Sequence, residues 1–322
     1  FLVGCRDTLG LTVPFTVRAD MLRDGMNEGN FSSPYGLVNT SHYQIDGVYH
    51  YGAYEPAYKD VLAFLNKLYA EKLLDNNLPS NTDDTSRAAM INGDAALTIG
   101  ATSWVAALTS AATAENYNLL AIQALSKERG EEPLFGQGDP VVTLSYWNFI
   151  TEDCKDVETA MKFLNYMQTE EGRLLGNFGE EGVTFEYVDG KPTFNDFVNK
   201  NPDGYTRDQL MRVHGFINWG CIHLREMSEQ RFPMQAQRDA INTWFTPSRD
   251  SYVILNDAID ASLINEYTSL WTDIETYINE SRVRFITGET SLDAFDQYID
   301  TLRSMGMDRV MEIRQISYDQ NN

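Results

Sequence analysis

The chain has 322 residues, of which 43% are hydrophobic and 22% are charged, and its formal net charge is −22. This length allows a large core and favours two lobes over one. Phosphate neutralisation needs clustered Lys and Arg, so the acidic charge excludes nucleic acid and an anionic membrane surface as expected partners.

The first residues lack an initiator Met and the apolar segment of a signal peptide. Leu2-Val3-Gly4-Cys5 matches a lipoprotein cleavage box, but the apolar segment that should precede it is absent. We therefore expect any signal or lipid anchor upstream of this chain rather than at Cys5. The other cysteines, Cys154 and Cys221, form no C-x-x-C pair, so at most one disulfide bond is expected.

The first predicted elements are a hairpin and a long helix. Asp46-Gly47 between alternating apolar residues is typical of a two-residue β-hairpin. A helix is expected over residues 56–73, with Pro56 at its first position. Its single apolar stripe is formed by Tyr58, Val61, Leu62, Leu65 and Leu68.

A second segment leads to an aromatic residue. Asp84 is expected to cap a short helix that ends at Asn92-Gly93. Alternating residues at 95–99 predict a strand, and small residues follow it up to Trp104. A large aromatic side chain on a loop beyond a strand end is placed to meet a ligand.

The middle of the chain contains candidate strands. One is expected at 119–124, and a Gly- and Pro-rich loop then indicates the start of a crossing between lobes. The next strand, 141–150, carries Tyr146 and Trp147, which point to opposite faces of a strand. At least one of them would face a cleft that this strand lines.

The following helices are predicted from caps and stripes. Asp156 is expected to cap a helix with the apolar face Val157, Ala160, Met161, Leu164 and Met167, and Thr169 to cap a second helix. Asp189-Gly190 indicates another hairpin. Residues 200–254 are hard to interpret, although Trp219 beside Gly220 has a loop-like setting. Apolar spacing then predicts a long helix over 263–285 and a second one capped by Ser291.

Signatures of catalysis are missing from the sequence. It contains no H-E-x-x-H, no G-x-S-x-G and no Walker A loop, so we expect no catalytic residues, no metal and no cofactor. Some pair among the 47 acidic residues could still have the spacing of a glycosidase. Glu180-Glu181 is the most site-like pair, although a solvated loop is the simpler interpretation.

Three segments resemble the extracellular solute-binding proteins of sugar ABC importers: "YKDVLAFLNKLYAEKLLD…INGDAALTIGATSW", "TEDCKDVETAMKFLNYMQTEEG" and "FITGETSLDAFDQYIDTLRSMGMDRVMEIRQISYDQ". The resemblance implies an α/β, periplasmic-binding-protein-like (type II) fold with two lobes. The opening strands of that family are absent here, so the fold is expected to be incomplete at its N-terminus. Residues 1–132 would form part of one lobe, residues 133–250 the hinge strand and part of the second, and residues 251–322 helices that pack back on the first.

The resemblance also implies a function. The protein would be the extracellular binding component of an ABC transporter, monomeric, with permease subunits as partners and with an oligosaccharide in an aromatic-lined cleft between the lobes. Trp104 matches the ligand-stacking Trp of the family, and the other candidates for ligand binding are Tyr146, Trp147, Trp219 and Trp271. The expected location is the cell surface, through a lipid anchor upstream, or the periplasm. The alternatives are a carbohydrate-active enzyme that uses two carboxylates and a peptide-binding member of the same superfamily.

Overall fold

The computed structural model describes all of the chain except residues 139–147, 201–204, 206, 216–223, 233, 255 and 322. Contacts divide the chain into two compact units, unit 1 (residues 1–137 and 239–322) and unit 2 (residues 138–238). The predicted lobe boundaries at 132 and 250 stay predictions.

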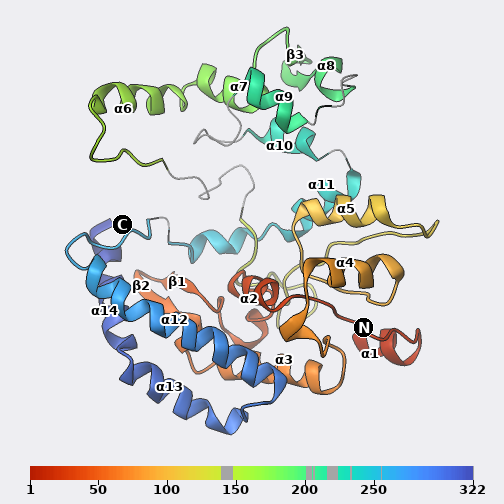
Figure 1. Cartoon of the computed structure of the whole chain (residues 1–322), viewed down its shortest axis with the longest axis vertical. Coiled ribbons are helices and arrows are strands. Elements are labelled where there is room, and N and C mark those ends of the chain that lie inside the picture. The colour runs from red at the N-terminus through yellow and green to blue at the C-terminus, as the bar shows by residue number, and fades with distance from the viewer. Residues whose placement is uncertain are drawn as a thin grey trace. The chain divides into compact units, whose positions relative to one another are not determined.

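Unit 1 is rich in helices (Figure 1). Its elements are α1 (Leu2–Asp7), α2 (Ala19–Asn27), β1 (His42–Ile45), β2 (Val48–Tyr51), α3 (Tyr58–Ala70), α4 (Asp83–Asn92), α5 (Thr102–Ala111), α12 (Ile264–Thr287), α13 (Phe295–Ser304) and α14 (Met307–Asn321). Unit 2 contains α6 (Val157–Tyr166), α7 (Glu170–Phe178), β3 (Phe185–Val188), β4 (Lys191–Phe194), α8 (Asp196–Asn199), α9 (Arg207–His214) and α10 (Arg225–Arg231), and α11 (Gln235–Trp244) spans the boundary at 239.

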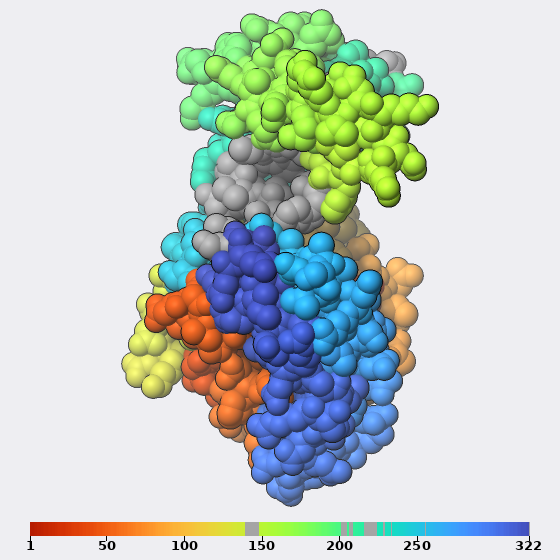
Figure 2. Space-filling view, turned by 90° about the vertical axis from the view of Figure 1, so that its left-hand side faces the viewer, coloured from red at the N-terminus to blue at the C-terminus, as the bar shows by residue number. Residues whose placement is uncertain are grey.

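The main core of unit 1 lies between α3 and the C-terminal helices. All five residues of the predicted stripe on α3 are buried, and α12 packs against this helix. Ile274, Ile278 and Phe285 of α12 belong to the same cluster. Burial of each such side chain stabilises the fold by roughly 1.5–3 kcal/mol. Figure 2 shows the blue residues of the C-terminal helices beside orange residues near the first hairpin, where α14 contacts β2.

The first hairpin is confirmed. β1 and β2 pair antiparallel, with Ile45 opposite Val48. Asp46 and Gly47 have φ angles of 51° and 83°, which are the positive values that a type I′ turn requires at both central residues.

Helix starts differ from two expectations. α3 begins at Tyr58, so Pro56 lies in the turn before the helix. α4 is capped by Thr82 and not by Asp84, because the Thr82 hydroxyl accepts a hydrogen bond from the backbone N–H of Thr85. The predicted end of α4 is confirmed, since Gly93 has the left-handed conformation.

Two predicted strands of unit 1 differ from the structure. Segment 95–99 forms one parallel bridge, from Leu97 to Phe15, and Phe15 also bridges Leu74. Segment 119–124 forms no strand, because it has no paired neighbour in the described part of the chain. Its side chains Leu120 and Ile122 are exposed.

Unit 2 has a small aromatic core of its own. Phe178, Phe185 and Phe194 pack together, the last two on the paired strands β3 and β4. The caps Asp156 and Thr169 are confirmed. The predicted apolar face of α6 is buried only in part: Met167, just beyond the helix, is fully buried, Ala160 and Leu164 are half-buried, and Val157 and Met161 are exposed. The predicted strand 141–150 lies mostly outside the described residues.

Candidate functional site

Trp104 is the third residue of α5. It therefore lies on a helix and not on the expected loop. The side chain is 7% exposed and packs with Met90, Ala95 and Leu108 in a small cluster of its own. A Cβ atom at Gly100 would lie 2.9 Å from Cγ of Trp104, so only glycine allows the backbone to approach the ring this closely.

A guanidinium group covers the same indole. Cζ of Arg87, on α4, lies 4.7 Å from the centroid of the Trp104 ring. This distance is within the range of a cation–π interaction. A flat aromatic surface and a cation therefore share one site between α4 and α5.

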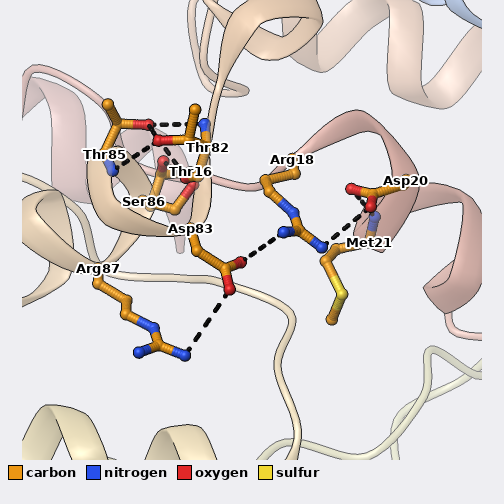
Figure 3. A network of polar contacts seen from close by, with 9 residues as sticks. All are labelled: Thr16, Arg18, Asp20, Met21, Thr82, Asp83, Thr85, Ser86 and Arg87. Carbon is orange, nitrogen blue, oxygen red and sulfur yellow. Dashed lines mark hydrogen bonds and ion pairs between the residues drawn. The ribbon is translucent and has the colours of Figure 1, made fainter.

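The Asp83 carboxylate lies between two guanidinium groups (Figure 3). Nη1 of Arg18 is 2.8 Å from its Oδ1 atom, and Nη2 of Arg87 is 3.8 Å from its Oδ2 atom. Arg18 also reaches Asp20, with 2.9 Å between Nη2 and Oδ2. We call these four residues and Trp104 the Arg–Asp–Trp cluster. All five belong to unit 1.

A capping box holds the first turn of α4, which carries Asp83. The backbone N–H of Thr82 donates to the Thr85 hydroxyl at 2.9 Å, and that of Thr85 donates to the Thr82 hydroxyl at 3.2 Å. The buried Thr16 hydroxyl lies 3.4 Å from that of Ser86, which joins α4 to the segment before Arg18 (Figure 3). The helix N-terminus also favours the negative charge of Asp83.

The charged groups of the cluster are accessible. The side chains of Arg18, Asp83 and Arg87 are 28%, 42% and 37% exposed. Ion pairs at this exposure contribute about 0–1 kcal/mol, so their partners exchange at little cost. The cluster can therefore offer an aromatic surface, a hydrogen-bond acceptor and several N–H donors to a polar ligand.

Trp271 belongs to a different aromatic group. It is half-buried on α12, with its ring stacked on that of Tyr267 at 5.9 Å and 5.6 Å from the ring of His42. Burial, together with the smaller effect of the Arg314 charge, lowers the pKa of His42 to about 3. Trp271 packs on the main core, whereas Trp104 lies in the separate cluster, so the structure does not bring these two candidates together.

The other predicted ligand residues, Tyr146, Trp147 and Trp219, lie outside the described residues. Sequence reasoning missed Arg18, Asp83 and Arg87. The spacing of Asp83 and Arg87 by four residues on a capped helix was an available signal, because such residues face each other. Nothing in the sequence linked Arg18 to them.

The remaining candidates for chemistry are weak. Glu180 and Glu181 are both exposed in unit 2, in the turn before β3. Within the described ranges no group of three or more His, Cys, Asp or Glu side chains could hold a metal ion, and no helix there is long and apolar enough to cross a membrane. Cys5 is 3% exposed within α1.

Comparisons show which proteins this chain resembles in sequence. The family model described as bacterial extracellular solute-binding protein matches residues 24–174. Lipoprotein LipO of Bacillus subtilis is 23% identical over 261 residues, which cover 79% of this chain and 50% of LipO. An uncharacterized protein encoded in the butB 5′ region of Niallia circulans is 22% identical over 255 residues, covering 77% of this chain and 93% of its own length.

Solved structures agree on the fold. The alginate-binding protein AlgQ2 has a TM-score of 0.65 at 18% identity, and the alignment covers 99% of this chain and 66% of AlgQ2. A solute-binding protein of Bifidobacterium longum infantis associated with an HMO-binding ABC transporter has a TM-score of 0.63 at 15% identity, covering 99% and 68%. The chain therefore spans half the length of LipO and about two thirds of these structures. The predicted resemblance and the α/β, periplasmic-binding-protein-like fold are confirmed.

Proposed function

We propose that this chain is an extracellular solute-binding protein, as the family match over residues 24–174 suggests, and that it binds an oligosaccharide for an ABC importer. The observation that carries the proposal is the Arg–Asp–Trp cluster. The C–H face of a sugar ring packs on an indole. Asp83 would accept hydrogen bonds from hydroxyl groups, and the guanidinium group of Arg18 would donate to hydroxyl oxygens.

Related proteins support a sugar as the ligand class. By their printed names, one structural neighbour binds alginate and another is a solute-binding protein associated with an HMO-binding ABC transporter, and residues 24–174 match an extracellular family. Permease subunits would be the partners, and the location would be outside the cytoplasmic membrane. The aromatic-lined cleft between lobes, the lipid anchor and the monomeric state stay predictions.

Thermal unfolding of the whole chain against a ligand panel tests the proposal. The panel contains neutral oligosaccharides, acidic oligosaccharides and short peptides. A ligand at 100 times its Kd adds about 2.7 kcal/mol to the free energy of unfolding. We expect a shift with one class of oligosaccharide. Stabilisation by peptides alone would contradict the proposal and favour the peptide-binding alternative.

Two variants assign the effect to the cluster. Trp104→Ala removes the aromatic surface, and Asp83→Asn removes a charge from a half-exposed position without changing the side-chain shape. Both should abolish or reduce the ligand shift. Tyr187→Ala is the matched control, because this exposed aromatic residue of β3 lies in unit 2. Chromatography of the same mixtures tests turnover. Cleavage products that disappear in Glu181→Gln would favour the enzyme alternative.

A further inference from the structure

We propose that Arg87 is an exchangeable cover of Trp104: it occupies the ring surface in the unliganded protein and leaves it when a sugar stacks there. Arg87 would then be a specificity-determining residue, because a ligand must displace its guanidinium group. This inference rests on the proposed function and names a further residue of the same site.

The first step of the argument is the burial of Trp104. Trp104 is 7% exposed, although it lies beside Arg87 and Asp83, whose side chains are 37% and 42% exposed. The Gly100 backbone approaches one part of the indole, and the Arg87 guanidinium lies over the ring at 4.7 Å. The backbone contact is permanent. The guanidinium is the part of this cover that belongs to a long side chain and can rotate away.

The second step is that Arg87 is weakly held. Its Nη2 atom is 3.8 Å from Asp83 Oδ2, which is longer than a hydrogen bond. The Nε atoms of Arg87 and Arg18 both lack a hydrogen-bond partner among the residues that the structure describes, so the two groups differ in their Nη contacts alone. Arg18, by contrast, is 2.8 Å from Asp83 and 2.9 Å from Asp20. Of the two guanidinium groups, that of Arg87 is therefore the one free to change partner.

The third step is a partner for the displaced group. Arg87 follows Asp83 by four residues on α4, so their side chains lie on one helix face. Rotation of Arg87 away from Trp104 would shorten the 3.8 Å separation to the ~2.8 Å of a charge-assisted hydrogen bond. The new ion pair offsets part of the loss of the cation–π contact. Displacement of Arg87 therefore keeps a small cost, which the stacking of the sugar must exceed.

The first experiment needs no ligand. In a whole-chain variant with Trp147, Trp219, Trp244 and Trp271 replaced by phenylalanine, acrylamide quenching reports on Trp104 alone. Arg87→Ala should increase the quenching constant of Trp104 by about twofold or more. Arg23→Ala is the matched control, because it removes the same charge from α2, where Arg23 pairs with Asp24. Unchanged quenching in Arg87→Ala overturns the inference.

The second experiment measures affinity for the oligosaccharide identified by thermal unfolding. A cation–π contact at an exposed site corresponds to about a two- to fivefold change in affinity. Arg87→Ala should tighten binding by this factor and Arg23→Ala should leave it unchanged. Weaker binding in Arg87→Ala overturns the cover and leaves the proposed function standing. Increased quenching without binding of any oligosaccharide supports the cover and contradicts the proposed function.

Discussion

Nε of Arg282 donates a hydrogen bond to the hydroxyl oxygen of Tyr58 at 3.0 Å, which joins α12 to α3 inside the main core. Both side chains are buried, with exposed fractions of 4% and 1%. Nη1 of Arg282 also donates to Asn279 Oδ1 at 2.8 Å. Burial raises the pKa of Tyr58, so its hydroxyl stays protonated and serves as the acceptor for the buried cation.

Tyr58→Phe should lower the free energy of unfolding by about 1.5–3 kcal/mol, because it removes a hydrogen bond to a buried charge. Urea unfolding measures the change. Tyr69→Phe is the matched control on the same helix, since the exposed Tyr69 hydroxyl donates to the Asn76 carbonyl at 3.0 Å. The control should cost less than about 0.5 kcal/mol. Equal losses in the two variants would contradict this role of Arg282.

Gly52→Ala should destabilise unit 1 strongly. A Cβ atom at Gly52 would lie 1.8 Å from the Asn39 carbonyl oxygen, and a backbone atom has little freedom to move. We expect a loss of about 3 kcal/mol in urea unfolding. Gly4→Ala is the comparison. Gly4 lies in α1, and a Cβ atom there would have no neighbour within 4 Å. Gly4→Ala should stabilise the protein by about 0.5–1 kcal/mol. If Gly52→Ala changed the free energy of unfolding no more than Gly4→Ala does, the backbone around Gly52 would have to relax to accommodate the methyl group.

The helices of unit 1 were predictable because their signals are local. The stripe on α3 and the spacing on α12 are properties of single segments. The α3 stripe is buried throughout, and the α12 stripe is buried from Ile274 to Phe285. Strands depend on partners elsewhere in the chain. Segment 119–124 is an apolar run that is compatible with a strand, but a strand needs a paired neighbour, and none is present among the described residues.

The candidate site was predictable only in its aromatic part. Trp104 is a rare residue type in a segment with a family pattern, so it could be named from the sequence. Arg18 is an ordinary charged residue, and it meets Asp83 only through the fold, which also brings Thr16 next to Ser86 of α4. Long-range polar contacts of this kind are not marked by any regular spacing of residues in the sequence.

Stability should decrease below pH 6.5 because of His42. Its pKa is about 3 in the folded protein and about 6.5 in the unfolded chain, so between these values only the unfolded chain binds the proton. The stabilisation by neutral His42 is fully present above pH 6.5. Each pH unit below 6.5 lowers the free energy of unfolding by about 1.4 kcal/mol. The neutral imidazole Nδ1 is hydrogen-bonded to the Tyr49 hydroxyl, and Arg314 opposes a second positive charge nearby.

Urea unfolding at several pH values tests the role of His42. Carboxylates titrate at the lower end of this range, so the comparison is between the wild type and His42→Gln. From pH 6.5 to 4 the free energy of unfolding should fall more steeply in the wild type than in His42→Gln. The difference in slope corresponds to the uptake of up to one proton on unfolding. Parallel curves for the two proteins would show that His42 is protonated in the folded state.

Thr82→Ala should affect stability and ligand binding together. It removes the cap of α4, which costs about 1 kcal/mol, and it loosens the turn that carries Asp83. Thr169→Ala removes a cap of the same type from α7 in unit 2, where the Thr169 hydroxyl accepts from the Gly172 N–H at 3.1 Å. The two variants should lose similar free energy of unfolding. Only Thr82→Ala should also weaken oligosaccharide binding measured by calorimetry, since α4 supplies both Asp83 and Arg87 to the cluster. Weakening by Thr169→Ala to the same extent would show that the effect follows global stability and not the geometry of α4.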